Sequence, residues 1–422
     1  MTRLGRIGAT LAAVGLLAAP LSAGAQAQTR NQAGALPSWA DQMEALKDVG
    51  GRLLATAERG DTEAHRQEMY RYVLGAVSNG FLNYVNVDMG HPTWTPLWNS
   101  AYNYGGPNPD YAYMFTLVDP KGAYRISGYR GTSRFVEITE QPSDFLTSSD
   151  GKHVPATHEL DTLHIGKDGY FSVIMSAERP AGYKGDWWRL DASTLSLLMR
   201  KASYDWRHEI DPRMAIDRLD DAPAPSPEEM ARRFSNLKDW VASTIESDIR
   251  LTHYYREHHG INTIKKSQLM ASSNPFPGQV YLDGAFQIAD DEALILETTV
   301  PAKCRYWQIL LADNRFATVD WVNRQSSLNG YQARLDKDGR FRAVIAARDP
   351  GAPNWLDTGG EAWGIIQMRW NRCADAPEPV VRKVALKDVR RFLPADTPVV
   401  TATARKEQLR LRREAAQLRQ LW

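Results

Sequence analysis

Residues 92–113, PTWTPLWNSAYNYGGPNPDYAY, place aromatic side chains beside short amide and carboxylate groups among prolines and glycines. Aromatic faces with such polar neighbours can hold a polar ring such as a sugar, which stacks on the ring face and hydrogen-bonds at its rim. A long ordered loop packed on a sheet accounts for the same residues equally well. If a ligand binds here, the predicted contacts are Trp94, Trp98, Asn108 and Tyr111.

Asp110 lies near the end of that stretch, and residues 185–209 supply further charged groups next to three tryptophans. A hydrolase or lyase needs a pair of titrating groups, for which Asp110 with Asp205 or Glu209 is the candidate catalytic set. Asp110 can equally be a turn or cap residue, and the charges around Arg200 can form a structural ion-pair network. Alternatively, an arginine fork there binds a ligand carboxylate through two hydrogen bonds. The predicted ligand-binding residues outside the first stretch are Arg130, Trp188 and Arg200.

Several strong catalytic and cofactor motifs are absent from the sequence. There is no GxSxG nucleophile elbow, HExxH zinc helix, P-loop or GxGxxG dinucleotide-binding turn. His253, His258 and His259 lack the i, i+4 spacing that places two imidazoles on one helix face. We therefore predict neither a metal site nor a cofactor, and the sequence leaves open whether the protein is an enzyme.

The spacing of apolar residues predicts helices, and alternating apolar residues with Asp-Gly turns predict short strands. The clearest helix starts at Ser226, a capping residue followed by Pro227 and Glu229, and stops at Gly260. We predict a mainly β protein with flanking α-helices (α+β), built from two tandem β-sandwich or jelly-roll-like domains. The predicted divisions are a helical segment (28–90), a first sandwich (91–219), a Pro-rich linker with a connecting helix (220–260) and a second sandwich (261–400).

The two β-rich regions resemble each other, which indicates an internal duplication. GKDGYFSVIMSAERP (166–180) aligns without a gap with DKDGRFRAVIAARDP (336–350). Each copy continues into a turn-rich stretch that contains tryptophan, and each closes on an apolar run that ends in Arg200 or Arg369. Upstream, AYRISGYRGTSRF aligns with RYWQILLADNRF with a one-residue gap.

CRYWQILLADNRF, the hairpin after it, PNWLDTGG and GIIQMRW resemble the C-terminal module called domain of unknown function DUF-1214. NPDYAYMFTLVDPKGAYRISG resembles the DUF-1254-like segment that often precedes this module in exported bacterial proteins. The resemblance covers roughly residues 100–140 and 275–375. It implies a β-sandwich or jelly-roll fold and carries no activity. Its most specific residues are Asn354, Trp355, Leu356 and Arg369.

Trp355 lies in a turn-rich stretch, RDPGAPNWLDTGGEAWG, where a tryptophan exposed to water is unexpected. It can plug the open end of a sandwich while its indole N–H reaches a partner. It can also stack on a ligand, in which case Trp355 and Arg369 are ligand-binding residues. The repeat favours the plug, because Trp187 and Trp188 occupy the matching stretch of the first copy.

The N-terminus has the pattern of a signal peptide. Arg3 and Arg6 precede an apolar run over residues 7–19, and small residues allow cleavage near Ala25 or Ala27. That run is too short to span a bilayer, and no later segment is an integral membrane candidate. Because residues 1–27 contain Arg3, Arg6 and no acid, cleavage leaves 49 of the 51 basic residues with 50 acidic ones. Such balance gives no long-range attraction for nucleic acid.

We therefore predict a periplasmic or secreted protein that binds, and in one interpretation hydrolyses or otherwise converts, a small polar or glycan-like ligand. The alternative is a non-catalytic structural or partner-binding protein of the cell envelope. Cys304 and Cys373, the only cysteines, are predicted to form a disulfide, since they begin and end strands whose opposite ends would meet at one sheet edge.

The C-terminal residues 401–422 predict a basic amphipathic helix with Leu411, Ala415, Leu418 and Trp422 on one face. A helix of this length is marginal alone in water. We expect it to pack on the body of the protein or on a second subunit of a homo-oligomer, with adsorption to a membrane surface as the weaker alternative.

Overall fold

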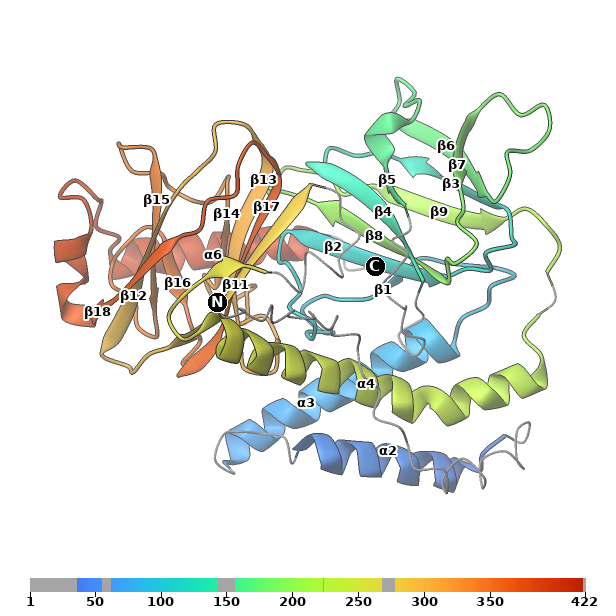
Figure 1. Cartoon of the computed structure of the whole chain (residues 1–422), viewed down its shortest axis with the longest axis horizontal. Helices are drawn as coiled ribbons and strands as arrows, with labels where there is room; N and C mark the ends of the chain where they lie inside the picture. Colours follow the sequence, from blue (N-terminus) through green and yellow to red (C-terminus); the bar gives the residue numbers. More distant parts are fainter. Residues whose placement is uncertain (1–35, 55–61, 143–155, 223, 268–277, 420–422) are drawn as a thin grey trace, which may run out of the picture.

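The computed structural model describes residues 36–54, 62–142, 156–222, 224–267 and 278–419. The predicted signal peptide and Trp422 lie outside these residues. The described chain contains two β-sandwiches side by side and a layer of helices below them (Figure 1). This confirms the predicted mainly β class with flanking helices. No helix in the described part of the chain is long and apolar enough to cross a membrane.

Each sandwich pairs a five-stranded sheet with a four-stranded sheet. The strand orders are β1-β2-β8-β4-β5 and β7-β6-β3-β9 in the first, and β10-β11-β17-β13-β14 and β16-β15-β12-β18 in the second. The strands of the first sandwich are β1 (Thr95–Pro96), β2 (Tyr111–Leu117), β3 (Tyr124–Tyr129), β4 (Phe135–Gln141), β5 (Thr157–Glu159), β6 (Tyr170–Ser176), β7 (Asp186–Arg189), β8 (Ser196–Ala202) and β9 (Arg213–Arg218). Those of the second are β10 (Lys265–Lys266), β11 (Gln279–Gln287), β12 (Glu292–Thr299), β13 (Cys304–Ala312), β14 (Ser327–Asn329), β15 (Arg340–Ala346), β16 (Trp355–Asp357), β17 (Trp363–Cys373) and β18 (Val380–Ala385).

The two sandwiches have the same topology, strand for strand, as an internal duplication requires. The aligned Lys-Asp-Gly turns both place a glycine at positive φ, Gly169 at 82° and Gly339 at 75°. The upstream part of the sequence alignment was wrong by one strand. It matched the segment of β3 to β13, whereas β13 occupies the position of β4 and the counterpart of β3 is β12. Both segments are apolar strands followed by arginine and phenylalanine, so local pattern alone could not separate them.

The core of each sandwich lies between its two sheets. Met114 and Ile138 from the five-stranded sheet meet Ile126, Phe171 and Val173 from the four-stranded sheet in the first sandwich. The second sandwich has the same arrangement around a larger set of buried residues that includes Trp307, Phe341 and Trp370. Side chains alternate along β8, so that Leu197 and Met199 point into the core of the first sandwich and Leu198 points to the opposite face of the sheet.

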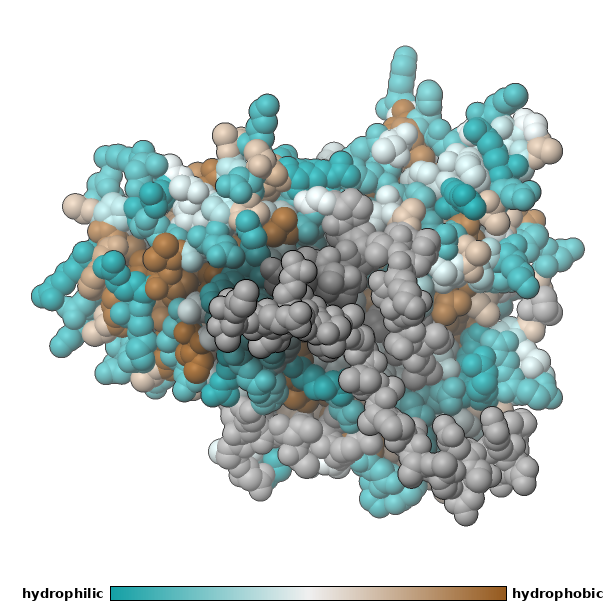
Figure 2. Space-filling model, viewed as in Figure 1, coloured by the Kyte–Doolittle hydropathy of each residue, from teal (hydrophilic) through white to brown (hydrophobic). Residues whose placement is uncertain are grey.

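The helical layer consists of α2 (Trp39–Leu54), α3 (Glu63–Gly80), which continues into a π-helical turn η1 (Phe81–Val85), and α4 (Pro227–His259). Short 3-10 turns follow β5 (η2, Leu160–Thr162) and β18 (η3, Leu386–Phe392). Ser226 caps α4 as predicted, since its hydroxyl accepts from the Glu229 backbone N–H, and Gly260 ends the helix at a φ of 86°. Leu237, Trp240 and Val241 of α4 pack against Val73 and Ala76 of α3. Most of the surface in this view is hydrophilic, and hydrophobic residues gather mainly over the second sandwich (Figure 2).

Helix α6 (Ala402–Leu418) packs on the body of the protein and runs from the second sandwich toward the first (Figure 1). Arginines make the contacts. Arg405 is buried, pairs with Asp349 and lies over the Trp355 ring, and Arg412 donates to the Trp321 carbonyl oxygen (2.6 Å). The predicted apolar stripe is only partly used for docking: Leu411 and Ala415 are partly buried, and Trp422 lies outside the described residues. Leu418 is 62% exposed, whereas guanidinium groups find carbonyl and carboxylate acceptors beside aromatic faces.

Cys304 and Cys373 form the predicted disulfide, directly across β13 and β17. The bridge closes a loop with a sequence separation of 69 residues. Replacing both cysteines by serine should lower the free energy of unfolding by about 4 kcal/mol, since the bridge restricts the unfolded chain. Urea unfolding of the oxidised protein and the double serine variant measures this, and equal midpoints would contradict it.

A second prediction concerns α6. Arg412→Ala should lower the free energy of unfolding by about 1–3 kcal/mol, because its guanidinium bonds Trp321 and Ser327 and lies 4.5 Å from the centre of the Trp206 ring. Arg410→Ala is the matched control, since Arg410 is exposed and pairs only with Glu407 and Glu414 of its own helix. Equal effects of the two variants in thermal unfolding would show that α6 is not held by its buried arginines.

Candidate functional site

Asp110 lies directly before β2, where the two sandwiches meet. Its Oδ1 accepts hydrogen bonds from the Trp206 indole N–H (2.8 Å) and the Asn329 amide (2.7 Å). Its Oδ2 accepts from the Tyr306 hydroxyl (2.6 Å). Because Tyr306 and Asn329 belong to β13 and β14, this carboxylate joins the two sandwiches through side chains nearly 200 or more residues away.

Asp110 is buried. The residue is 3% exposed, and burial raises the pKa of its carboxyl while the hydrogen bonds from Tyr306, Asn329 and Trp206 oppose that rise. Asn108 completes the cluster by donating to the Tyr306 hydroxyl (2.7 Å), so that hydroxyl accepts from one side chain and donates to the other. A carboxylate with three donors is well suited to hold two domains together.

Arg200 and Arg369 occupy equivalent places in the two sandwiches. Arg200 of β8 is paired across the sheet with Tyr113, and Arg369 of β17 with Tyr281. Each guanidinium carbon lies near its tyrosine ring, 5.9 Å and 5.2 Å from the ring centres. Both arginines are 5% exposed, and burial lowers the pKa of Arg200. The two buried cations therefore face the junction of the sandwiches from opposite sheets.

Hydrogen bonds from the two arginines reach side-chain and backbone oxygens. Arg200 donates to the Thr139 hydroxyl (3.2 Å), and Arg369 donates to the Gly106 carbonyl oxygen (3.3 Å) through Nη2. Nη1 of Arg369 is buried and has no hydrogen-bond partner in the described structure. Cation–π contact with the tyrosines offsets part of the cost of burying these charges.

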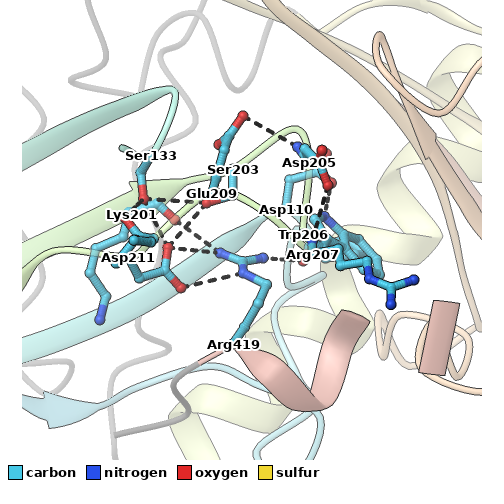
Figure 3. A network of polar contacts seen from close by, with 12 residues as sticks. Asp110, Ser133, Lys201, Ser203, Asp205, Trp206, Arg207, Glu209, Asp211 and Arg419 are labelled. Atoms are coloured by element: carbon cyan, nitrogen blue, oxygen red, sulfur yellow. Dashed lines mark hydrogen bonds and ion pairs between the residues drawn. The ribbon is translucent and has the colours of Figure 1, made fainter. Parts of the chain in front are cut away.

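Asp205 and Glu209 shape the turn after β8. Asp205 accepts from the Arg207 backbone N–H (3.1 Å) and pairs with His208 (2.7 Å). Glu209 accepts from the backbone N–H groups of Tyr204 and Arg134, both at 3.1 Å. Figure 3 shows Asp110, Asp205 and Glu209 in one polar neighbourhood, with no hydrogen bond drawn from Asp110 to either of the other two. The fold thus brings the three carboxylates of the predicted catalytic set into one region. Each of them already accepts hydrogen bonds from groups that hold the local structure.

Arg419, directly after α6, ends the helix on the first sandwich. It pairs with Asp211 (3.4 Å) and donates to the Pro109 carbonyl oxygen (3.0 Å), next to Asp110 (Figure 3). Asp211 also accepts from Ser133 (3.0 Å) and Ser203 (3.1 Å). Charge pairing with Arg419 and Lys201 overcomes burial and lowers the pKa of Asp211.

A cavity of about 250 Å³ opens beside this network. The first sandwich contributes Trp98, Tyr111 and Trp206 to its walls, the second contributes Trp321, and α6 contributes Ala416. We call this cavity the interdomain pocket. It contains two of the residues predicted from sequence, Trp98 and Tyr111, and it exists only where both sandwiches and α6 come together.

The other predicted ligand-binding residues lie elsewhere. Arg130 pairs with Asp161 (2.6 Å), and Trp188 stacks on His158 in the first core. Trp94 lines a different cavity in the first sandwich. Trp355 is 6% exposed, its indole N–H reaches the Ala346 carbonyl oxygen (2.9 Å), and Arg405 covers its ring, which is the plug geometry.

Sequence reasoning missed several residues of the junction: Trp206, Tyr306, Trp321, Asn329 and Arg419. Trp206 had a visible signal in the sequence, since it is one of the three tryptophans in the charged stretch 185–209. Tyr306 and Asn329 had none, because only the docking of the two sandwiches brings them to Asp110. No group of three or more His, Cys, Asp or Glu suited to a metal ion occurs among the residues placed by the structure.

The second sandwich carries the DUF-1214 signature at the level of a family model. Residues 286–370 match the model described as "Protein of unknown function (DUF1214)". The resemblance inferred from the sequence is confirmed for this module, which contains Tyr306, Asn329, Trp355 and Arg369.

The chain is also similar to a solved structure over most of its length. It shares 28% sequence identity and a TM-score of 0.75 with the crystal structure of an uncharacterized protein from Burkholderia cenocepacia, covering 86% of this chain and 99% of that one. A protein from Vibrio parahaemolyticus gives a TM-score of 0.44 at 12% identity, covering 75% of this chain and 98% of that one. A search of curated proteins finds no match. The first likeness extends across both sandwiches, whereas the family model covers the second alone.

Tyr306→Phe should lower the free energy of unfolding by about 1.5–3 kcal/mol, because it removes a buried hydrogen bond to a carboxylate. Tyr170→Phe is the control, since Tyr170 is 43% exposed. Chemical denaturation of both variants tests this, and a loss for Tyr306→Phe no larger than for the control would contradict it.

The raised pKa of Asp110 predicts a pH dependence of stability. A raised folded pKa means that the protonated form is favoured in the folded chain. The resulting stabilisation is present below the ordinary pKa of 3.8 and is lost as the pH rises through the folded pKa. The stability of the wild type relative to Asp110→Asn should therefore fall as the pH rises across that window. A constant or rising difference in denaturation experiments would contradict the assigned direction.

Proposed function

We propose that this protein is exported and binds a small polar, glycan-like ligand in the interdomain pocket. The observation that carries the proposal is the gathering of Trp98, Trp206 and Trp321 with Tyr111 around one cavity. Flat aromatic faces bind the apolar face of a sugar ring, whose hydroxyls remain free to bond polar groups at the rim.

The size of the pocket supports a small ligand. Its volume of about 250 Å³ is below the roughly 300 Å³ at which pockets for drug-sized molecules begin. One sugar ring, or a molecule of similar size, is the occupant that suits it. Larger glycans would have to enter by one terminal unit only.

Polar groups are present to orient such a ring. Asn99 lines the pocket, and its carbonyl oxygen accepts from the backbone N–H groups of Ala101 and Tyr102. These bonds use the side-chain oxygen of Asn99, so its side-chain N–H groups can donate to a ligand. Gln417 on α6 also lines the pocket, and Arg419 adds a cation. Two amides and a guanidinium can bond the hydroxyls of a sugar or the carboxylate of a sugar acid.

Export is supported by two features. The N-terminal residues have the charge and apolar pattern of a signal peptide. The Cys304–Cys373 bridge is of the kind that persists in oxidising compartments such as the periplasm. A periplasmic or secreted location follows as part of the proposal.

Conversion of the ligand by Asp110, Asp205 and Glu209 stays a prediction with less support than binding. Asp110 already accepts three hydrogen bonds, and the other two carboxylates bond backbone N–H groups. The same saturation favours the second candidate, a non-catalytic envelope protein in which the junction is structural. A measurement of whether any small ligand binds distinguishes the two candidate functions.

The test is a thermal-shift and tryptophan-fluorescence screen with glucose, N-acetylglucosamine and glucuronate. A ligand of the interdomain pocket should raise the melting temperature and change the fluorescence of the pocket tryptophans. Trp98→Ala should weaken binding about tenfold or more, equivalent to roughly 1.4 kcal/mol. Ala416→Trp should block binding, because it fills the pocket from α6.

Trp39→Ala is the matched control, since Trp39 lies on α2 and is 77% exposed. It should bind as the wild type does. If no probe shifts the melting temperature, the envelope-protein candidate is favoured. If binding occurs and Ala416→Trp leaves it unchanged, the ligand does not occupy this pocket.

A further inference from the structure

The first sandwich has a cavity of its own, of about 340 Å³, at one end of the space between its sheets. Met114 and Met199 of the five-stranded sheet and Met214 and Ile216 of the edge strand β9 form its apolar lining. Methionine side chains are flexible and adapt to ligands of varied shape. We call this the sandwich cavity. It shares no lining residue with the interdomain pocket.

Lys201 lines the sandwich cavity from β8. Met199 and Lys201 are two residues apart on the same strand, so both side chains point between the sheets, whereas Arg200 points to the junction. Lys201 as a residue is 3% exposed, and its ammonium nitrogen, which is not among the fully buried atoms, has no hydrogen bond or ion pair with a described residue. A buried lysine without a partner is costly, because the charge loses its hydration without compensation.

The one nearby carboxylate is already engaged. Asp211 pairs with Arg419 and accepts hydrogen bonds from Ser133 and Ser203. In Figure 3 the Lys201 side chain runs away from the Arg419 guanidinium. Burial lowers the pKa of Lys201, and the attraction of Asp211 opposes this only in part. The ammonium group is therefore left to face the cavity.

A second donor lines the same cavity. The indole N–H of Trp94 is buried and has no partner in the described structure, and Trp94 is 9% exposed. Buried indole N–H groups usually have a hydrogen-bond partner. The cavity is thus lined by two residues with donors of different chemistry, the Lys201 ammonium group and the Trp94 indole N–H, for which the described structure shows no acceptor.

The second sandwich has no counterpart of this arrangement. Because Arg200 and Arg369 are equivalent in the duplication, the position of Lys201 corresponds to Trp370. Trp370 is 1% exposed and fills the core of its sandwich. By the register of β1 and β10, Trp94 corresponds to Ile264, which is also buried in that core. The first copy therefore has two polar donors where the second copy has apolar packing.

We infer that the sandwich cavity is a second ligand site, which takes a small carboxylate with an apolar tail. The carboxylate accepts from the Lys201 ammonium group and the Trp94 indole N–H, and the tail lies among Met114, Met199 and Met214. Charge selects the head group, since a cationic ligand would meet Lys201 and the nearby Arg213 at the cavity lining. The volume exceeds the roughly 300 Å³ of the smallest pockets for drug-sized molecules, which leaves room for a short acyl chain.

The experiment is calorimetric titration of the full chain with octanoate, octanol and octylamine. Octanoate should bind best, and octylamine should not bind. Lys201→Met keeps the length of the side chain and removes the charge, so the variant should remain folded and bind octanoate about ten- to hundredfold more weakly. Trp94→Phe keeps a ring without the N–H and should also weaken binding. Ala416→Trp should bind octanoate as the wild type does, which separates this site from the interdomain pocket.

Methionine methyl NMR locates the ligand directly. Octanoate should shift the signals of Met114, Met199 and Met214 and leave that of Met368, the counterpart of Met199 in the second sandwich, in place. The inference is overturned if octanoate does not bind, if octylamine binds as tightly, or if Lys201→Met binds octanoate with wild-type affinity. Shifts confined to other methionines would overturn it as well.

Discussion

The rest of the structure depends on the buried carboxylate of Asp110 and its three donors. Two of them, Tyr306 and Asn329, come from the second sandwich, and the third, Trp206, comes from the first. A buried carboxylate is stable only when it is hydrogen-bonded, and separation of the sandwiches would remove two of the three donors of Asp110. The Asp110 cluster acts together with other contacts between the sandwiches, such as the ion pair of Arg305 with Glu137, and the interdomain pocket lies beside it with walls from both sandwiches.

The duplication explains which features the halves share and where they differ. Each copy has a buried arginine beside a tyrosine at the junction. Each copy also has a tryptophan in the short strand, β7 or β16, that pairs in parallel with the strand after the Lys-Asp-Gly turn. The indole N–H of Trp187 bonds the Ser176 hydroxyl (3.0 Å), as that of Trp355 bonds the Ala346 carbonyl oxygen. These shared features stabilise the sandwich. The differences, above all Lys201 against Trp370, are the positions where the first copy can have acquired a role of its own.

Local signals made most of the fold predictable from the sequence. Ser226, Pro227 and Gly260 marked the longest helix, and the aligned Lys-Asp-Gly turns marked the repeat. The sequence has only two cysteines, so only one pairing within the chain was possible. The interdomain contacts were not predictable. The alternation of side chains along β13 indicates which face of the sheet carries Tyr306, but it does not indicate that this face packs against the first sandwich. The part that the arginines of α6 play in its docking was also not predicted: the spacing of residues in the sequence indicated only its apolar face, whereas Arg405 and Arg412 bond acceptors on the body.

Differential scanning calorimetry of the wild type and Asp110→Ala tests the central claim, that the Asp110 cluster makes the two sandwiches one cooperative unit. The account predicts a single transition for the wild type, with equal calorimetric and van't Hoff enthalpies. It predicts two resolved transitions for Asp110→Ala, because each sandwich has its own core and can unfold separately once the junction fails. Two independent transitions in the wild type, or one unchanged transition in the variant, would contradict it.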